Sequence, residues 1–166
     1  MSDELENAEQ SDFLFYNGPD SSLRIEVFYA DETVWLTQER MAALFNKAKS
    51  TISEHIQNVY NEGELEKAAT MRKFGNTELS ATKPTYYYNL DIIISVGYRV
   101  KSLEGTWFRQ WATKRLQEYI IKGFAMNDQR LKQGGAGARY FTELLQRVRD
   151  IRSSERNLYQ RVTDIY

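Results

Sequence analysis

Residues 36–58, LTQERMAALFNKAKSTISEHIQN, contain two short amphipathic patterns separated by a sharp turn. Thr37 offers an N-cap hydroxyl to a first helix that begins at Gln38. The apolar face of this helix carries Met41, Ala42 and Phe45. Asn46 follows at the point where the chain must reverse, because asparagine tolerates a positive φ better than most residues do. We therefore predict that the first helix ends there.

A second helix is predicted to follow, with Ser50 or Thr51 as its cap. Its apolar residues Ile52, Ile56 and Val59 recur at the i, i+4 and i+7 spacing of a buried helix face. The small side chain of Ala42 lets the two helices approach closely. Two helices joined in this way form a helix-turn-helix, whose second helix can enter the DNA major groove. A DNA-binding module is therefore our first hypothesis.

Extended segments on either side predict a winged helix-turn-helix over residues 23–89. Residues 23–29 alternate apolar and polar side chains, and residues 33–36 resume extended structure after a turn at 30–32, which is typical of a hairpin. Gly63 is placed to end the second helix, and residues 70–74 and 85–89 predict two strands around a polar stretch. Basic residues on or beside this wing, where they can meet phosphates, are Arg72, Lys73 and Lys83. Residues 1–22 are predicted to be a disordered acidic lead.

The second half of the chain predicts helices, so the fold class is α+β and mostly helical. A helical region covers residues 90–133, with helices at 90–100, capped by Asn89, and 106–122. The second of these carries an apolar stripe that we expect to be core: Phe108, Trp111, Ala112, Leu116, Tyr119 and Ile120. Residues 134–137, GGAG, predict a flexible hinge.

A long C-terminal helix, resembling a coiled-coil strand, is predicted over residues 138–166. Its a and d heptad positions hold Phe141, Leu144, Val148, Ile151, Leu158, Val162 and Ile165, interrupted only by Glu155. Such a narrow seam favours a partner helix, so we expect a homodimer, and the orientation of the pair stays open. The alternative is a helix that folds back on its own domain. The heptad pattern runs on to Tyr166 without a cap, so we expect a longer protein.

Composition and charge exclude several classes of protein. The chain has no cysteine and one histidine, His55, which argues against zinc, disulfide and Ser-His-Asp chemistry. No apolar run suggests a membrane span and no signal peptide is visible, so we expect a cytoplasmic protein. Residues 97–166 hold 14 basic and 7 acidic side chains, a balance that suits polyanions. Residues 37–66, by contrast, hold three basic and five acidic side chains, which weakens the DNA hypothesis.

Several segments resemble the RhuM family of bacterial virulence proteins. They are residues 36–38 (LTQ), 51–56 (TISEHI), 88–91 (YNLD), 96–100 (VGYRV), 105–113 (GTWFRQWAT) and 140–152. Arg99 and residues 108–113 are also similar to the Bro-N signature of phage antirepressors. Where Bro-N stretches continue into a proline-containing end, this chain reads LQEY at 116–119. Both resemblances imply DNA-associated proteins of mobile elements, and neither implies a catalytic motif.

We therefore expect a DNA-binding regulator of a mobile element or pathogenicity island that binds duplex DNA as a dimer. Besides the wing residues, the expected DNA surface comprises Lys47, Lys49, Ser50, Thr51, Ser53, Glu54, His55 and Asn58. The alternative is a protein-interaction module, such as an antirepressor- or antitoxin-like adaptor. A nuclease-type toxin ranks last, because Asp91, Glu104 and Glu118 have no spacing that unites them around a metal. We expect no enzyme activity, cofactor or metal, and a protein partner stays open.

Overall fold

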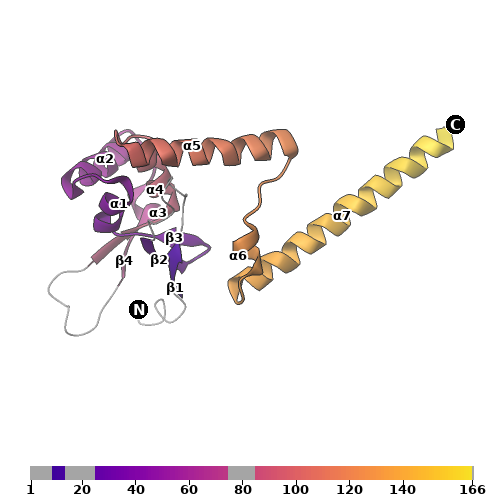
Figure 1. The fold of residues 1–166 in the computed structure, drawn as a ribbon, viewed down its shortest axis with the longest axis horizontal. Helices are drawn as coiled ribbons and strands as arrows, with labels where there is room; N and C mark the ends of the chain where they lie inside the picture. Colours follow the sequence, from indigo (N-terminus) through magenta and orange to yellow (C-terminus); the bar gives the residue numbers. More distant parts are fainter. Residues whose placement is uncertain (1–8, 14–24, 75–84, 166) are drawn as a thin grey trace. The chain divides into compact units, whose positions relative to one another are not determined.

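The computed structural model describes residues 9–13, 25–74 and 85–165, in two units, Met1–Gln117 and Glu118–Tyr166 (Figure 1). Most of the described chain is helical, with two small antiparallel sheets. The first unit contains β1 (Glu9–Phe13), β2 (Ile25–Ala30), β3 (Thr33–Trp35), α1 (Gln38–Phe45), α2 (Lys49–Asn61), α3 (Lys67–Thr70), β4 (Met71–Phe74), β5 (Thr85–Tyr88), α4 (Leu90–Gly97) and α5 (Leu103–Gln117). The second contains η1 (Glu118–Lys122), α6 (Asp128–Lys132) and α7 (Ala136–Ile165). Among the described residues, no helix combines the length and apolarity needed to span a membrane.

The first sheet has the strand order β1-β2-β3. The predicted hairpin is confirmed, and its two-residue turn uses positive φ angles of 51° at Asp31 and 59° at Glu32. Strand β1 differs from the prediction, because it lies within the lead that we expected to be disordered. Its residues pair with the free edge of β2, from Glu9 opposite Tyr29 to Phe13 opposite Ile25. The composition of the lead does not reveal such a pairing, since the partner edge comes from another part of the chain.

Helices α1 and α2 occupy the predicted positions. Thr37 caps α1 by accepting a hydrogen bond from the Arg40 amide at 3.2 Å, and Asn46 ends it with a φ of 51°. The prediction that Ser50 or Thr51 caps α2 is wrong. Helix α2 begins earlier, with Ala48 at the N-cap position and no side-chain cap, so both hydroxyls lie inside its first turn. Lys49 is accordingly the first residue of α2.

The end of α2 is fixed by the glycine that the sequence singles out. Gly63 has a φ of 72° and donates its amide to the Tyr60 carbonyl at 3.1 Å. The Glu64 amide reaches back to the Val59 carbonyl at 3.1 Å. This pair of hydrogen bonds satisfies carbonyls that the last turn of a helix leaves without partners.

The hairpin β4–β5 is joined directly to the start of α1. Leu36 and Tyr88 exchange two backbone hydrogen bonds of 2.9 and 2.8 Å, and the Gln38 amide donates to the Tyr88 hydroxyl at 3.0 Å. Both strands match the predicted pair of strands. The tip between them, including Lys83, lies outside the described residues. The hairpin is therefore held at its base by the segment that enters α1.

One apolar core unites these elements of the first unit. Side chains from β2, β3, α1, α2, β5, α4 and α5 form it, and its largest fully buried members include Phe45 and Phe108, whose rings meet edge to face at 5.5 Å. Asn89 caps α4 as predicted by accepting from the Ile92 amide. Gly97 allows Phe108 to approach, because a Cβ there would lie 2.3 Å from the ring. Burial of these side chains is the main source of stability for the unit.

The apolar stripe expected on residues 106–122 is core only in its first part. Phe108 is buried, and Trp111 and Ala112 are half-buried. Leu116, Tyr119 and Ile120 are instead exposed, by 54%, 64% and 75%. The predicted single helix also begins earlier, at Leu103, and changes to π-helical hydrogen bonding from Glu118. The prediction fails here because the helix extends beyond the core of the first unit, which periodicity alone cannot show.

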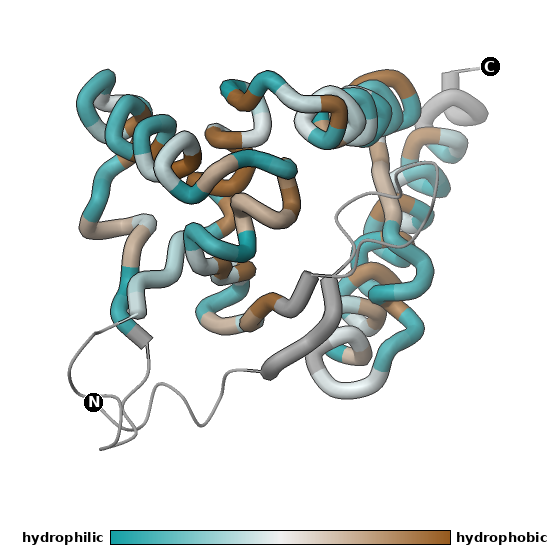
Figure 2. Tube along the Cα trace, turned by 60° about the vertical axis from the view of Figure 1, so that its left-hand side comes forward, coloured by the Kyte–Doolittle hydropathy of each residue, from teal (hydrophilic) through white to brown (hydrophobic). Residues whose placement is uncertain are grey.

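The second unit contains the predicted long helix, α7, preceded by the short α6. The expected hinge is wrong in part, because Ala136 and Gly137 already belong to α7. Gly137 is a packing position: a Cβ there would lie 2.6 Å from the Arg130 carbonyl oxygen of α6. Apolar residues recur along α7 among hydrophilic ones (Figure 2), and its seam side chains up to Leu158 face solvent wholly or in part.

Candidate nucleic-acid interface

The outer face of α2 carries the polar residues that the sequence marks for DNA contact. Ile52, Ile56 and Val59 are buried, which turns the opposite side of the helix to solvent. Ser50 and Glu54 are exposed, and the remaining predicted residues of the helix, Thr51, Ser53, His55 and Asn58, are half-buried on its flanks. The structure thus places all of them at the surface of one helix.

The sequence interpretation missed Gln57, which is also exposed on α2. Ser50, Glu54, Gln57 and Asn61 follow the same i, i+4, i+7 and i+11 spacing as one helix face, and all four are exposed. This spacing could have identified Gln57 from the sequence. A glutamine amide both donates and accepts hydrogen bonds, so it suits the edge of an adenine base.

The two lysines near the start of α2 differ in their surroundings. Lys47 is half-buried in the turn, whereas Lys49 is exposed at the first turn of the helix. The Lys49 ammonium lies 2.6 Å from a Glu39 carboxylate oxygen, and this contact lowers the pKa of Glu39. Both side chains are about 60% exposed, at 59% and 61%, so the ion pair contributes little to stability. A phosphate group can therefore compete with Glu39 for Lys49.

The basic residues of β4 lie on opposite faces of the hairpin. The Lys73 ammonium sits 5.2 Å from the centre of the Tyr86 ring, opposite it in the register. Tyr86 and Tyr88 share a face, because side chains alternate along a strand. The hydroxyl of Tyr88 accepts a hydrogen bond from the side-chain amide of Gln38. Burial raises the pKa of Tyr88 and this hydrogen bond lowers it, while Tyr86 and Glu39 raise it slightly and Lys49 lowers it slightly. Lys73 therefore lies on the side of the hairpin that faces α1 and the start of α2.

Arg72 points to the other side, toward the first sheet. Its guanidinium pairs with the Asp31 carboxylate in the β2–β3 turn and lies 5.1 Å from the centre of the Trp35 ring. On the same side, the Tyr87 ring meets Phe28 edge to face at 5.4 Å. Arg72 thus joins the hairpin to β2 and β3. We predicted Arg72 and Lys73 together as basic wing residues, but their side chains lie on opposite faces of the hairpin.

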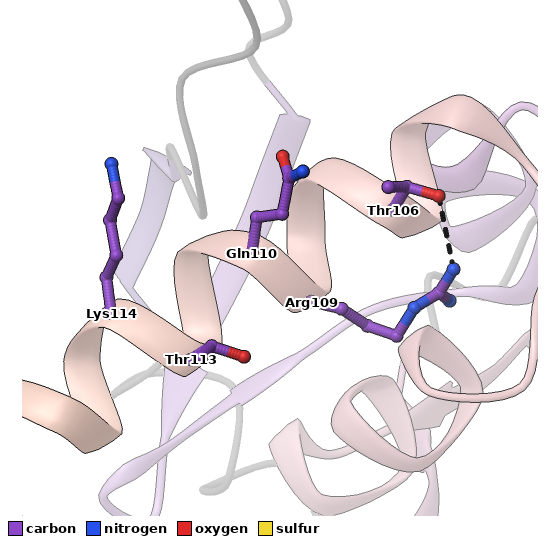
Figure 3. A pocket seen from close by; sticks show the side chains of 5 residues that line it. All are labelled: Thr106, Arg109, Gln110, Thr113 and Lys114. Carbon is purple, nitrogen blue, oxygen red and sulfur yellow. Dashed lines mark hydrogen bonds between the residues drawn. The ribbon is translucent and has the colours of Figure 1, made fainter.

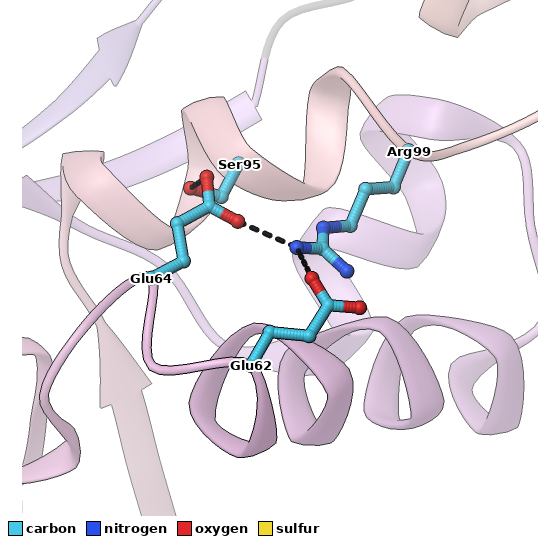
Figure 4. Close-up of polar contacts among 4 residues, drawn as sticks. All are labelled: Glu62, Glu64, Ser95 and Arg99. Carbon is cyan, nitrogen blue, oxygen red and sulfur yellow. Dashed lines mark hydrogen bonds and ion pairs between the residues drawn. The ribbon is translucent and has the colours of Figure 1, made fainter.

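The acidic residues at the end of α2 are paired with an arginine from α4's C-terminal loop. The Arg99 guanidinium lies between two carboxylates, 2.6 Å from Glu62 and 2.5 Å from Glu64 (Figure 4). The other oxygen of the Glu64 carboxylate accepts a hydrogen bond from Ser95 at 3.1 Å. Arg99 lowers the pKa of Glu62, and the two carboxylates raise the pKa of Arg99. The acidic excess of residues 37–66 is thus partly neutralised by a residue outside that segment.

His55, the single histidine, lies on the flank of α2. Burial is the main cause of its lowered pKa. The Glu54 carboxylate raises this pKa, whereas the nearby positive charges of Arg99 and Lys47 lower it. The neutral imidazole therefore predominates near pH 7. A neutral ring can donate or accept one hydrogen bond at a base edge, and a phosphate nearby would favour its protonation.

A shallow pocket on α5 is lined by Thr106, Arg109, Gln110, Thr113 and Lys114 (Figure 3). The Arg109 guanidinium donates to the Gly97 and Val100 carbonyls, both at 2.9 Å, and to Thr106 at 3.2 Å. Arg109 therefore satisfies carbonyls at the end of α4 instead of presenting its charge to solvent. Within the described ranges, no three histidine or acidic side chains gather where they could hold a metal ion.

These features define a small helical unit with a polar helix face and an adjacent hairpin, followed by a unit with a long helix. The family model described as Virulence protein RhuM family matches residues 65–166. The chain therefore belongs to the RhuM family of virulence proteins, as the sequence motifs suggested. No curated protein and no solved structure matches the chain. The family match begins after α2, so it does not bear on the polar face of that helix.

Proposed function

We propose that the first unit is a winged helix-turn-helix that binds duplex DNA, and that the protein is a regulator rather than an enzyme. In this proposal α2 is the recognition helix, β4–β5 is the wing, and the regulated target belongs to a mobile element or pathogenicity island. The observation that carries the proposal is the attachment of the hairpin beside α1. The Leu36–Tyr88 hydrogen bonds and the Gln38–Tyr88 contact hold Lys73 on the side facing the start of α2.

The polar side chains of α2 would provide sequence recognition. Gln57 and Asn58 carry amides that fit adenine, and Ser50 can donate to or accept from several bases. Glu54 can accept a hydrogen bond from the amino group of cytosine. Because its carboxylate also repels phosphates, Glu54 would favour sites that place a cytosine opposite it.

Three lysines would provide the phosphate contacts that fix the register. Lys47 and Lys49 lie at the start of α2, and Lys73 lies on the adjacent side of the hairpin. Phosphate contacts position a protein on DNA without reading sequence, and they make affinity depend on salt. Because the set has only three lysines, we expect moderate affinity for random DNA. We expect contacts with the correct base sequence to contribute a larger share of the binding free energy.

The proposal is tested by binding the full chain to a pool of random duplex DNA and sequencing the retained molecules. A shared motif is expected in the retained pool, and Lys47→Glu with Lys49→Glu should abolish retention while leaving the helical content unchanged. The matched control is Lys67→Glu with Lys132→Glu, the same charge reversal at exposed positions outside α2 and the hairpin. Equal retention of both double variants would contradict the proposal.

A protein-interaction module is the second candidate, and the exposed apolar side chains of α7 favour it. Val148, Ile151 and Leu158 are all more than half exposed in the single chain. Large exposed apolar stripes of this kind mark interaction surfaces. An adaptor of this type would bind a protein partner and show no salt-dependent affinity for duplex DNA, which separates it from the first candidate.

A further inference from the structure

The seam of α7 is a strip of exposed apolar side chains that is interrupted only by Glu155. Phe141, Val148, Ile151 and Leu158 are exposed by 46%, 51%, 69% and 62%. The side chains of heptad positions a and d lie on one face of a helix, so these residues form a single strip about five turns long. Leu145 and Tyr159, beside the strip, are exposed by 41% and 66% and widen it. A strip of this width fits one further helix.

Arginines border this strip. Arg147 occupies a g position and Arg152 an e position, so they lie on opposite edges of the seam. Arg149 and Arg156 lie beyond Arg152, and these three arginines line one shallow surface with Ser153. In the part of α7 whose side chains are described, no e or g position is acidic. The acids Glu143 and Asp150 occupy c positions, away from the seam.

A second copy of α7 matches these borders poorly. In a parallel pair, Arg147 would lie beside Arg152 of the other copy, and the two Glu155 side chains would face each other within the seam. In an antiparallel pair that aligns the whole seam, Arg152 would lie beside Arg152, and position 147 beside position 161, which is also arginine. Both orientations bring like charges together, which destabilises association.

We propose that the seam of α7 binds a helix of another protein with an apolar a/d face and with Glu or Asp at its e and g positions. Carboxylates on such a helix would meet Arg147 and Arg152, and a basic residue opposite Glu155 would complete the match. The inference goes beyond DNA binding, because it concerns α7 alone. The apolar residues of the seam are compatible with a homodimer and with a pair formed with another protein. The bordering arginines favour the second arrangement, so this inference replaces the predicted homodimer with a heterotypic pair.

Nucleic acid is a weaker match for this surface than an acidic helix. Arginines attract phosphates, but duplex DNA offers no continuous apolar face to cover Val148, Ile151 and Leu158. An amphipathic acidic helix covers the apolar strip and neutralises its borders at the same time. The juxtaposition of the two features therefore favours a protein partner.

The test uses two synthetic peptides with the same isoleucine and leucine seam, one with Glu and one with Lys at every e and g position. Anisotropy of the labelled peptides is measured with the full chain. We expect the glutamate peptide to bind at least about tenfold more tightly than the lysine peptide. Arg147→Gln with Arg152→Gln should weaken glutamate-peptide binding about fivefold.

The matched control is Gln146→Glu with Asn157→Glu, which makes the same change in net charge at exposed f and c positions, away from the seam and from the arginine surface. This variant should bind the glutamate peptide as the unaltered chain does, and circular dichroism checks that all variants keep their helix. Ile151→Asp should abolish binding by placing a charge in the seam. These readouts do not involve DNA, so they stand or fall separately from the proposed function of the first unit.

Three results would overturn the inference. The first is equal affinity for both peptides, which would mean that the arginines do not select the partner. The second is a stable dimer of the chain in sedimentation that Ile151→Asp dissociates, which would make a second copy the occupant. The third is a loss of duplex-DNA affinity in the Arg147 and Arg152 variant with unchanged peptide binding, which would make the surface a nucleic-acid site.

Discussion

Lys73 and Tyr86 face each other across the β4–β5 hairpin, with the Lys73 ammonium 5.2 Å from the centre of the Tyr86 ring. The next residue back, Arg72, is directed to the other face by the alternation of the strand and contacts Asp31 and Trp35. Two adjacent basic residues of one strand therefore have different surroundings. One faces the start of α2, and the other joins the hairpin to the first sheet.

This division predicts that two neighbouring substitutions affect different properties, DNA affinity in one case and stability in the other. Lys73→Ala should weaken binding to duplex DNA about threefold, the loss of one phosphate contact, and lower the free energy of unfolding by only about 0.5 kcal/mol, the loss of its contact with the Tyr86 ring. Arg72→Ala should lower the free energy of unfolding by about 1 kcal/mol, because it removes an exposed ion pair and a cation–π contact. Urea denaturation and fluorescence anisotropy measure the two quantities. A larger loss of DNA affinity from Arg72→Ala than from Lys73→Ala would refute the division.

Glu39→Gln should strengthen DNA binding. The Glu39 carboxylate holds the Lys49 ammonium at 2.6 Å, so its neutralisation releases the lysine and removes a charge that repels phosphates. We expect a gain of about threefold at low salt, corresponding to less than ~1 kcal/mol. Glu66→Gln is the control, because it removes an equal charge from an exposed side chain at the start of α3. The prediction fails when both variants change affinity equally.

Arg99→Ala should lower the stability of the first unit and weaken DNA binding, because it leaves the Glu62 and Glu64 carboxylates without their cation. Glu62→Gln with Glu64→Gln in the same chain should restore DNA affinity. Arg99 lowers the pKa of Glu62, so its stabilising effect is present above the ordinary value of 4.5 and is lost as the pH falls through the lowered pKa. Thermal denaturation is measured from the ordinary pKa of Glu62 down through its lowered pKa. Over this pH interval, the stability of Arg99→Ala should fall less steeply with decreasing pH than the stability of the unaltered chain.

Stability should also depend on His55 near neutral pH. Burial lowers its pKa from 6.5 in the folded protein, so the unfolded chain binds a proton more readily. The free energy of unfolding should therefore fall as the pH decreases through about 6.5 and reach its full value above it. The chain has a single histidine, so His55→Gln should flatten this slope. Chemical denaturation at about pH 5.5 and 7.5 measures it, and an unchanged slope in the variant would exclude His55 as its origin.

The parts of the fold that depend on local sequence could be predicted. The Thr37 and Asn89 caps, the positive φ of Asn46 and the glycine at the end of α2 all follow from the chemistry of single residues. The strands β2 to β5 followed from alternation and composition, and α7 from its long apolar repeat. The prediction began α2 too far along the chain, because serine and threonine are favourable N-cap residues and alanine, which occupies the N-cap at position 48, is not.

The parts that depend on contacts between distant residues could not be predicted. Strand β1 needs the free edge of β2, and the charge balance of α2 depends on Arg99, which lies 37 residues beyond Glu62. Arg109 contacts carbonyls at the end of α4, which its position in the sequence does not reveal. Counting charges along a segment gives no information about such pairings. The split between Arg72 and Lys73 likewise required the register of the hairpin.

The salt dependence of DNA binding tests the central claim most directly. Affinity for duplex DNA is measured across a range of salt concentrations for the unaltered chain and for the triple variant Lys47→Gln, Lys49→Gln and Lys73→Gln. Each phosphate contact contributes about 0.9 to the slope of log affinity against log salt, so we predict a slope smaller by about 2 to 3 in the variant. Lys67→Gln with Lys132→Gln should keep the slope of the unaltered chain. Equal slopes for the unaltered chain and the triple variant would contradict the account.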